Sequence, residues 1–429
     1  MKSANQIPEG WKFLRIGDCC LVKRGASPRP IQDPKWWGND IGWVRISDVT
    51  SSNKYLFKTR DYLSALGVKK SVEINPGEVI LSICATIGRP IITTFPVCIH
   101  DGFVWFDELI KDVDREYLYY YLSSKEEILS NSRQTGTQGN LNTGIVSRVG
   151  LLLPTSKPEQ TKIAEILSTV DRAIAETEAL IAKRQRIKTG LMQDLLTRGI
   201  DEHGNIRSEQ THQFKDSLLG RIPMEWEVAE IEKKLDEIID YRGRTPKKVD
   251  SGVPLITAKN VRDGYLNIYP QEFIEEGAYD DWMTRGIPHY GDILFTTEAP
   301  MGNVAKVPEY RIALAQRLLT LLVNSNELSS DYLYWVLHWE NSRDRIELLT
   351  SGSTVVGVKQ SVFRKVLLRF PSKDEQERIS SVLNSHKEKV ESENSKHNKL
   401  KILKTALMQD LLTGIKRVTP LLDEGVING

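Results

Sequence analysis

The chain has 429 residues, with 58 basic and 57 acidic side chains and a formal net charge of +1. A chain of this length can hold two or three domains that each bury a core without disulfides, and the balanced charge means that any DNA-binding surface must come from local clusters of cations. No stretch approaches the roughly 18 apolar residues needed to cross a bilayer, and the start lacks the apolar core of a signal peptide, so we expect a cytoplasmic protein.

The four cysteines predict reduced and mostly buried thiols. Cys19, Cys20, Cys84 and Cys98 all lie in the first third of the chain, and none forms a CxxC pair near a histidine. The seven histidines form no HxxxH or HExxH pattern, which leaves metal catalysis without support. We therefore expect neither a metal site nor a redox-active dithiol.

Residues 1–155 predict a globular domain that mixes strands and helices. Short β-rich runs such as "GWVRI" and "EVILSI" alternate with turn clusters, and "REYLYYYLSS" at 115–124 has the pattern of an aromatic helix. Trp11 and Trp226, each three residues after a proline, are expected to pack in a core or an interface rather than to stack on bases. Trp36 and Trp37 fit either a core or a wedge on a loop.

Residues 156–199 predict one long helix. Ser156 and Glu159 form an S-x-x-E capping box, in which the two side chains satisfy backbone donors at a helix start. Gly199 stands where a left-handed C-terminal cap is wanted, and about 40 residues free of proline after the first turn give about 60 Å of helix. Two neighbouring apolar stripes imply that this helix packs on more than one side.

The rest of the chain repeats this order. Residues 200–221 are a polar connector, and residues 222–371 form a second mixed domain, with strand candidates "DILFTT" and "KVLLRF" and an aromatic helix candidate at 330–339. Residues 372–414 predict a second long helix, and residues 415–429 a loose tail.

The two halves are a tandem duplication. Residues 159–197 align with residues 375–413 without a gap, and both stretches end in "LMQDLLT". Upstream, "IPEGW" matches "IPMEW" and "RGASPR" matches "RGRTPK". Ser372, Glu375 and Gly414 repeat the capping signals of the first helix.

The duplication predicts the fold class. We expect α+β (α/β) globular domains in two copies, separated by two long antiparallel helices that form a coiled-coil-like spacer with pseudo-twofold symmetry. The middle of the second helix is polar, with His386, Glu393 and His397 at positions where apolar residues would fit, which predicts a partly hydrated or asymmetric pairing there. A plain helix pair without an external partner remains the alternative.

Matched polar loops in the two domains are candidates for DNA contacts. Reading of bases needs hydrogen-bonding side chains on loops, and binding of phosphates needs cations. Cations surround both RGx(S/T)P turns, and two further loop pairs, "CATIGRP" with "EAPMGNV" and "RQTGTQGNLNTG" with "LTSGSTVVGVKQ", are rich in small polar residues. Solvated basic loops and ordinary turns are the competing interpretation. The candidates are Lys23, Arg24, Arg29, Lys35, Arg45, Thr86, Arg89, Gln134, Thr137, Gln138, Asn140, Arg242, Arg244, Thr245, Lys247, Lys248, Lys259, Asn303, Ser353, Thr354 and Lys359.

Motifs for catalysis are missing from the sequence. It has no GxxxxGK(S/T) phosphate loop, no (N/D)PP(Y/F) stretch typical of an amino-methyltransferase, no GxSxG elbow and no recognisable nuclease spacing of carboxylates and lysine. Three hypotheses remain: a DNA-specificity protein without catalytic activity, a two-headed scaffold that binds proteins, and a self-contained enzyme that modifies DNA. The missing motifs favour the first over the third.

The opening "IPxxW" of each half, the RGx(S/T)P turns, the helix starts "PEQTKIAEIL" and "DEQERISSVL" and above all the doubled "LMQDLLT" resemble the specificity subunit of type I restriction-modification enzymes. The resemblance covers essentially the whole chain. It implies two target-recognition domains that each read one half of a split DNA site.

The same resemblance implies the partners. The two helices would dock two methyltransferase subunits and, through them, two restriction subunits, and S-adenosylmethionine and ATP would belong to those partners, so this chain needs no cofactor of its own. A duplicated helix would then supply two equivalent docking surfaces. The helix residues expected to contribute to docking are Ile163, Leu167, Ile174, Leu191, Leu195, Ile379, Leu383, Leu407 and Leu411.

Overall fold

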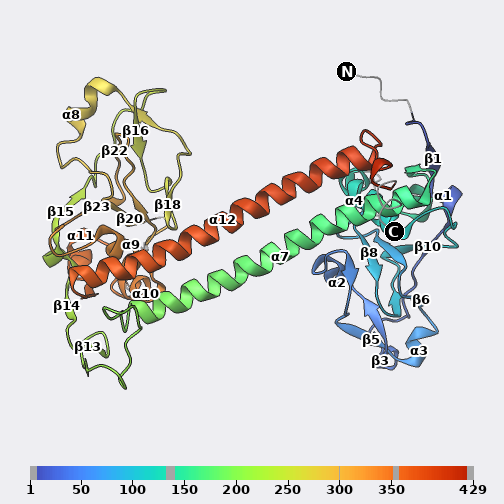
Figure 1. Ribbon diagram of the computed structural model, residues 1–429, viewed down its shortest axis with the longest axis horizontal. Helices are drawn as coiled ribbons and strands as arrows, with labels where there is room; N and C mark the ends of the chain where they lie inside the picture. Colours follow the sequence, from blue (N-terminus) through green and yellow to red (C-terminus); the bar gives the residue numbers. More distant parts are fainter. Residues whose placement is uncertain (1–6, 132–140, 299, 351–356, 423–429) are drawn as a thin grey trace. The chain divides into compact units, whose positions relative to one another are not determined.

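The computed structural model describes residues 7–131, 141–298, 300–350 and 357–422 (Figure 1). The chain divides into two compact units. Unit 1 comprises residues 1–178 and 395–429, and unit 2 comprises residues 179–394. Each unit therefore contains one mixed α/β domain and one half of each long helix, α7 (Lys157–Leu195) and α12 (Lys373–Leu412).

Two sheets form the domain of unit 1. The strands of the five-stranded sheet are, in spatial order, β2 (Leu21–Arg24), β10 (Phe103–Asp107), β7 (Val79–Ser82), β8 (Pro90–Thr93) and β4 (Tyr55–Leu56). The strands of the four-stranded sheet are β5 (Asp61–Leu63), β3 (Trp37–Val44), β9 (Val97–Ile99) and β6 (Val72–Ile74). Both sheets are mixed, since β4 runs parallel to β8 and β3 runs parallel to β9.

Short helices and one further strand pair complete this domain. The pair consists of β1 (Trp11–Arg15) and β11 (Gly150–Pro154), which join antiparallel just before α7 begins. The helices are α1 (Ile16–Cys19), η1 (Pro34–Trp36), α2 (Ile46–Thr50), α3 (Ala65–Val68), α4 (Arg115–Ser124), α5 (Glu126–Asn131) and α6 (Thr143–Ser147).

The domain of unit 2 repeats the arrangement with shorter strands. Its four-stranded sheet has the order β15 (Leu235–Asp240), β23 (Leu318–Val323), β20 (Ile293–Thr296) and β21 (Val304–Lys306). Its three-stranded sheet has the order β19 (Phe273–Ile274), β16 (Val253–Ile256) and β22 (Ala313–Leu314). This smaller sheet is also mixed, because β16 runs parallel to β22, as β3 runs parallel to β9 in unit 1.

Three two-stranded sheets and several short helices complete unit 2. The strand pairs are β14 (Glu227–Glu230) with β24 (Leu367–Phe370), β17 (Val261–Arg262) with β18 (Tyr265–Leu266), and β12 (Phe214–Lys215) with β13 (Ile222–Pro223). The helices are η2 (Ile231–Lys234), η3 (Glu276–Ala278), α8 (Tyr279–Trp282), α9 (Ser330–His338), α10 (Glu340–Leu348) and α11 (Gln360–Phe363).

The aromatic helices α4 and α9 form at the predicted positions, and a glutamine from each long helix anchors them. Gln160 accepts a hydrogen bond from the backbone of Asp114, the N-cap of α4, at 2.9 Å. Gln376 accepts one from the backbone of Ser329, the N-cap of α9, at 2.8 Å. Both amides also donate to two backbone carbonyls, so these buried side chains join each long helix to its domain.

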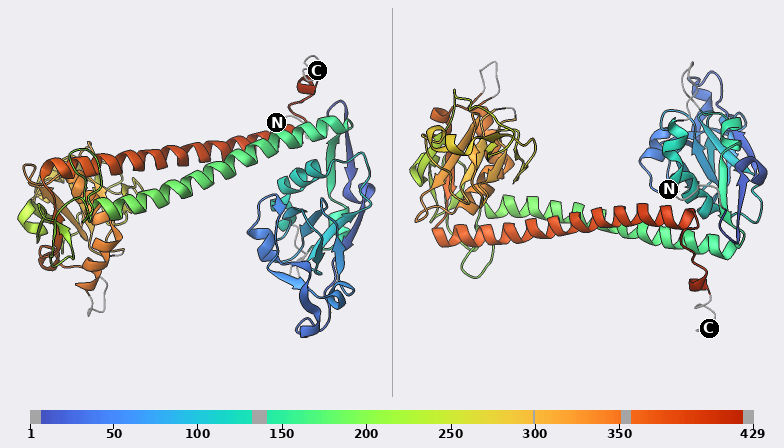
Figure 2. Two further views of the ribbon diagram at one scale, coloured as in Figure 1. Left: turned by 60° about the horizontal axis from the view of Figure 1, so that its bottom comes forward. Right: turned by 90° about the horizontal axis from the view of Figure 1, so that it is seen from above.

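In each unit a half of α7 lies beside a half of α12, and the two helices run in opposite directions (Figures 1 and 2). In unit 1, Asp171 pairs with Lys404 at 2.6 Å, and Glu178, two turns further along α7, contacts His397 at 2.8 Å. In unit 2, Arg184 lies 3.6 Å from Glu393. The polar middle of α12 thus supplies ion pairs across the helix pair.

The capping-box prediction was wrong for the glutamates. Ser372 does accept from the backbone of Glu375, at 3.4 Å, but the Glu375 carboxylate does not turn back to the helix start. It is buried and pairs with Arg207 of the connector, and it accepts from the backbone of Ile200 at 3.0 Å and from the Trp226 indole at 3.1 Å. The connector is therefore an ordered part of unit 2.

The same arrangement closes unit 1. The buried carboxylate of Glu159 binds Arg417 through two hydrogen bonds of 2.7 and 2.8 Å, and Val418 beside it is buried. The described start of the predicted loose tail is therefore packed, because it supplies the cation that Glu159 needs. The equivalent of the Trp226 indole nitrogen, that of Trp11, is buried without a hydrogen-bond partner among the described residues.

Gly199 and Gly414 adopt the predicted left-handed conformation, with φ of +69° and +72°. Both also stand where a side chain does not fit. A Cβ at Gly199 would lie 2.1 Å from a Glu375 oxygen and 2.5 Å from the Trp226 ring, and one at Gly414 would lie 3.0 Å from the Trp11 ring. Each glycine lets the chain turn against the tryptophan of its unit.

Candidate nucleic-acid interface

The RGASPR turn of unit 1 follows β2 and wraps around one carboxylate, that of Asp101. Arg24 Nε donates to the Asp101 carbonyl, and Ser27 Oγ donates to Asp101 Oδ1 at 2.8 Å. Arg29 lies 3.3 Å from Asp101 Oδ2, with 79% of its side chain exposed. Although burial opposes it, the hydrogen bond from Ser27 and the neighbouring Arg24 hold the pKa of Asp101 below its usual value. Asp101 is therefore a carboxylate among exposed cations.

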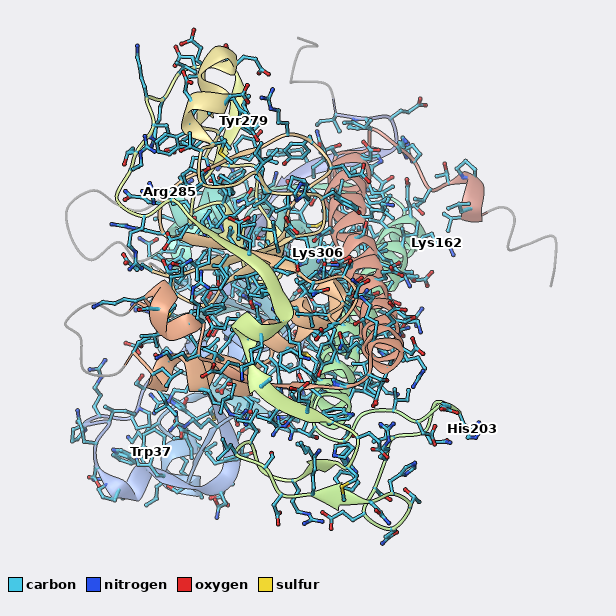
Figure 3. The ribbon with its side chains drawn as sticks, turned by 90° about the vertical axis from the view of Figure 1, so that its left-hand side faces the viewer. Trp37, Lys162, His203, Tyr279, Arg285 and Lys306 are labelled. Carbon is cyan, nitrogen blue, oxygen red and sulfur yellow. The ribbon has the colours of Figure 1, made fainter. Side chains whose placement is uncertain are left out.

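A second group of predicted residues lies near the two tryptophans that the sequence left undecided. Lys35 lies 4.4 Å from the centre of the Trp36 ring, and the Arg45 guanidinium lies 5.3 Å from that of Trp37. Trp36 is buried, Trp37 is partly buried against a small hydrophobic cluster, and both indoles donate to backbone carbonyls, so both pack within this domain. Figure 3 labels Trp37.

Three further candidates of unit 1, Lys23, Thr86 and Arg89, make contacts within their own domain. Lys23 pairs with Asp107 across the strands β2 and β10. Arg89 donates to the carbonyl of Ser52 at 3.0 Å, and the carbonyl of Thr86 accepts from Ser82 inside the same turn. These contacts shape the loop that carries them. Whether Lys23, Thr86 and Arg89 also touch DNA stays a prediction.

In unit 2 the RGRTPK turn carries more unopposed charge. Arg242, Arg244, Thr245, Lys247 and Lys248 are all exposed. Only one carboxylate, that of Glu272, is paired with this group within the described residues, at 2.8 Å from Lys248. The Arg244 guanidinium lies 5.4 Å from the centre of the Trp282 ring. The position equivalent to Asp101 is occupied by the uncharged Gln316.

A cavity of about 270 Å³ opens beside this turn. Its polar lining residues are Arg244, Thr245, Lys248, Thr257, Lys259, Glu272, Gln316 and Arg317. Arg317 adopts φ of +71°, which a non-glycine residue takes at a cost of about 1–3 kcal/mol. Its side chain is exposed and lies 3.4 Å from Glu298. Cations and exposed hydrogen-bonding groups therefore line the cavity together. DNA requires both, because cations bind its phosphates and hydrogen-bonding groups contact its base edges.

The other predicted residues of unit 2 divide in the same way. Asn303, the equivalent of Arg89, donates to the carbonyl of Val261 at 2.9 Å and holds its turn. Lys359 is exposed at the start of α11. Six predicted residues lie outside the described part of the chain, namely Gln134, Thr137, Gln138, Asn140, Ser353 and Thr354.

The sequence interpretation missed Asp101, Arg285, Gln316 and Arg317. Arg285, labelled in Figure 3, donates to the carbonyls of Asp240 and Arg242 at 2.8 and 3.0 Å and supports the base of the RGRTPK turn. An alignment of "CIHDGFV" with "ALAQRLL" places Asp101 opposite Gln316 and would have revealed Asp101, Gln316 and Arg317, whereas Arg285 lies outside these stretches.

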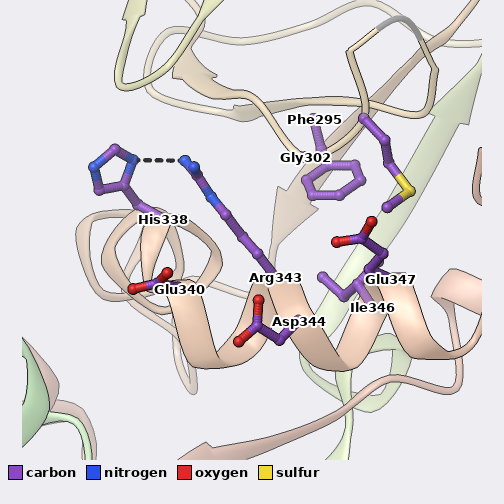
Figure 4. A pocket seen from close by; sticks show the side chains of 9 residues that line it. Phe295, Gly302, His338, Glu340, Arg343, Asp344, Ile346 and Glu347 are labelled. Atoms are coloured by element: carbon purple, nitrogen blue, oxygen red, sulfur yellow. Dashed lines mark hydrogen bonds between the residues drawn. The ribbon is translucent and has the colours of Figure 1, made fainter. Parts of the chain in front are cut away.

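Another cavity of unit 2, of about 380 Å³, lies between α10 and the turn that contains Gly302 (Figure 4). Beside it, Arg343 contacts His338 Nδ1 at 3.0 Å and pairs with Asp263. The Asp263 carboxylate contacts both His338 and Arg343. These two contacts hold the pKa of Asp263 well below its usual range, although burial opposes this. This charge group joins the loop before β18 to the helix pair α9–α10.

The predicted docking residues on the long helices need correction. Six of the nine, Ile163, Leu167, Leu195, Ile379, Leu383 and Leu411, are at most 4% exposed, because each packs in the core of its own unit. Leu191 and Leu407 are partly buried against the same cores, and Ile174 is partly buried. A helix partner would instead meet the exposed apolar side chains Ile187, Ile402 and Leu403.

The geometry can be set beside known proteins. A family model described as "Type I restriction modification DNA specificity domain" matches residues 8–186 and again residues 223–402. The chain belongs to this family of type I restriction-modification specificity proteins. It carries two copies of the DNA specificity domain, which makes it a recognition subunit rather than a catalytic one.

One relative matches nearly the whole chain, and another matches about two thirds of it. The type I restriction enzyme MjaVIII specificity subunit of Methanocaldococcus jannaschii is 26% identical, over 97% of this chain and 95% of that protein. The putative MjaX specificity subunit of the same organism is 26% identical, over 70% of this chain and 67% of that protein.

The crystal structure of the type I restriction-modification S subunit from M. genitalium has a similar fold, with a TM-score of 0.61 at 14% identity, over 96% of this chain and 98% of that one. A chain from a study of complex assembly and conformational transition of the type I R-M system gives 0.57 at 18% identity, over 95% and 99%. The predicted fold class of two mixed domains and two long helices is thus confirmed. In the described part of this specificity protein, no helix is both long and apolar enough to cross a membrane.

Proposed function

We propose that each domain of this specificity protein reads one half of a bipartite DNA site, and that its helices dock two methyltransferase subunits in the cytoplasm. Through these, two restriction subunits join the complex. S-adenosylmethionine and ATP bind to the partners, and this chain supplies recognition and assembly.

The observation that carries the proposal is the duplicated basic turn. In both domains an RGx(S/T)P turn follows an edge strand of the larger sheet, β2 in unit 1 and β15 in unit 2. The turn places exposed cations beside a second turn, the one that leads into the neighbouring strand β10 or β23. Exposed arginines and lysines bind phosphates, and the polar side chains among them are suited to base edges. Two similar domains of one chain would read two half-sites.

The helices support the assembly step. Ile187 on α7 and Leu403 on α12 occupy equivalent positions of the repeat, and their side chains are 41% and 46% exposed. One such residue belongs to each unit. Equivalent apolar surfaces of this kind would suit two copies of the same partner.

Binding of DNA by the complex with its methyltransferase partner tests the proposal. Affinity for duplexes from a random library is measured between 50 and 200 mM salt, conditions over which 6 to 10 phosphate contacts would lower it by about 10³ to 10⁵. The expected enriched sequence has two specific parts and an unspecific gap. Salt-independent binding would point to a scaffold for proteins, and methyl transfer or cleavage by the purified chain alone would point to a self-contained enzyme.

A further inference from the structure

Asp101 and Gln316 occupy the same place in their two domains. Each lies in the turn between a strand of the smaller sheet and the strand that follows it in the larger sheet, β9 to β10 in unit 1 and β22 to β23 in unit 2. Each also contacts the hydroxyl of the RGx(S/T)P turn. Ser27 Oγ donates to Asp101 at 2.8 Å, and Gln316 Nε2 lies 3.4 Å from Thr245 Oγ1. The contact is kept although the residue type differs.

Both side chains remain accessible to a ligand. The Asp101 side chain is 42% exposed, and Gln316 lines the cavity beside the RGRTPK turn. A carboxylate has about four acceptor sites, of which Asp101 uses one for Ser27 and one near Arg29. Gln316 uses one of its two N–H donors on Thr245, which leaves the other donor and the carbonyl oxygen open within the described residues.

The charges around the two positions suit contact with DNA. A carboxylate near phosphates is repelled unless cations offset it, and Arg24 and Arg29 flank Asp101. Its neighbour His100 is neutral, because burial lowers the pKa of the imidazole and Nδ1 accepts from the backbone of Gly102 at 2.9 Å. Asp101 is ionised at neutral pH and acts only as an acceptor.

We propose that this shared position reads one base in each half-site, with Asp101 accepting from the amino group of a cytosine and Gln316 pairing with an adenine. The chemistry follows from the two side chains. A carboxylate accepts from cytosine N4 in the major groove, whereas a carboxamide pairs with N6 and N7 of adenine through one donor and one acceptor. The difference between residues 101 and 316 then makes the two half-sites differ at this base pair.

The inference rests on the proposed function, and its test separates the two. The full chain is produced with its methyltransferase partner in a host, and the methylated motif is determined by methylome sequencing. Asp101→Asn keeps the size of the side chain and adds a donor. The expected result is a change from cytosine to adenine at one base pair, in one half-site only, with a preference of about 5- to 150-fold.

The reciprocal variant tests the second domain. Gln316→Asp is expected to exchange adenine for cytosine at one base pair of the other half-site. Asp112→Asn and Gln271→Asp are matched controls, because both residues are exposed and lie outside the two turns. They are expected to leave the motif unchanged. Ser27→Ala tests support of the turn alone, and is expected to weaken binding without changing the motif.

Three results would overturn the inference. The first is a normal motif in both Asp101→Asn and Gln316→Asp. The second is a loss of DNA affinity in these variants that is equal for all sequences, which would mean that the two side chains only support the turn. The third is a motif change in the control variants as large as that in the test variants. A wild-type complex without a bipartite motif would instead remove the proposed function itself.

Discussion

The ion pair between Arg207 and Glu375 offers a sharp test of what closes each unit. The two side chains are only 10% and 3% exposed, so Arg207→Met strands a carboxylate inside unit 2. Removal of one partner from a buried pair costs about 3–5 kcal/mol. The hydrogen bonds from the Ile200 backbone and the Trp226 indole still reach the carboxylate, so we expect about 3 kcal/mol, at the lower end.

The equivalent variant in unit 1 provides the comparison. Arg417 is 32% exposed beside the fully buried Glu159, so water can replace part of its charge in Arg417→Met. We expect a smaller cost there, of about 1–2 kcal/mol. The difference between these two free-energy costs corresponds to about a tenfold difference between the variants in the rate of exchange through local opening.

Hydrogen exchange of the full chain, followed by mass spectrometry, measures the two effects separately. Arg207→Met is expected to speed exchange in peptides that cover 196–210 and 370–385. Arg417→Met is expected to speed it in peptides that cover 156–170 and 408–422. Adding Glu375→Gln to Arg207→Met removes the stranded charge and is expected to restore most of the protection. An effect of Arg417→Met equal to or larger than that of Arg207→Met would refute this reasoning.

Three further predictions concern binding, assembly and pH. Arg29→Ala and Arg244→Ala are each expected to weaken duplex binding and to lower the slope of affinity against salt by about 1, as measured by fluorescence anisotropy; unchanged affinity in both would mean that the contact turns are misplaced. Ile187→Asp and Leu403→Asp place a charge on the exposed apolar helix positions and are expected to abolish co-elution with the methyltransferase on size-exclusion chromatography while leaving the circular dichroism unchanged. Because the pKa of Asp263 is depressed in the folded protein, its ion pairing stabilises unit 2 fully above the unfolded pKa of about 4 and progressively less as pH falls from there towards the folded pKa; Asp263→Asn should therefore lower resistance to urea more at pH 7 than at pH 2, and an equal loss at both would contradict the assignment.

The repeated helices were predictable because their signals are local. The spacing of apolar residues, the aromatic runs at 115–124 and 330–339 and the terminal glycines depend on neighbours within a few turns, and the structure has α4 and α9 at those places. The tandem repeat added a second, independent copy of each signal.

The misread features depend on contacts between distant residues. Glu375 has the right spacing for a capping box, yet its partner Arg207 lies 168 positions earlier, on a connector whose polar composition gave no hint of burial. Likewise, a stripe such as Ile163 and Leu167 shows that a helix face is apolar and does not say whether a domain of the same chain or a partner covers it. Asp101 was missed because its role depends on a turn more than 70 positions away.

In both units a glutamate at the start of one long helix pairs with an arginine beyond the end of the other. The two domains are therefore held by the same kind of contact. Each domain position offers the same kind of ion pair to the domain that occupies it, although the arginine of unit 2 is more deeply buried than that of unit 1.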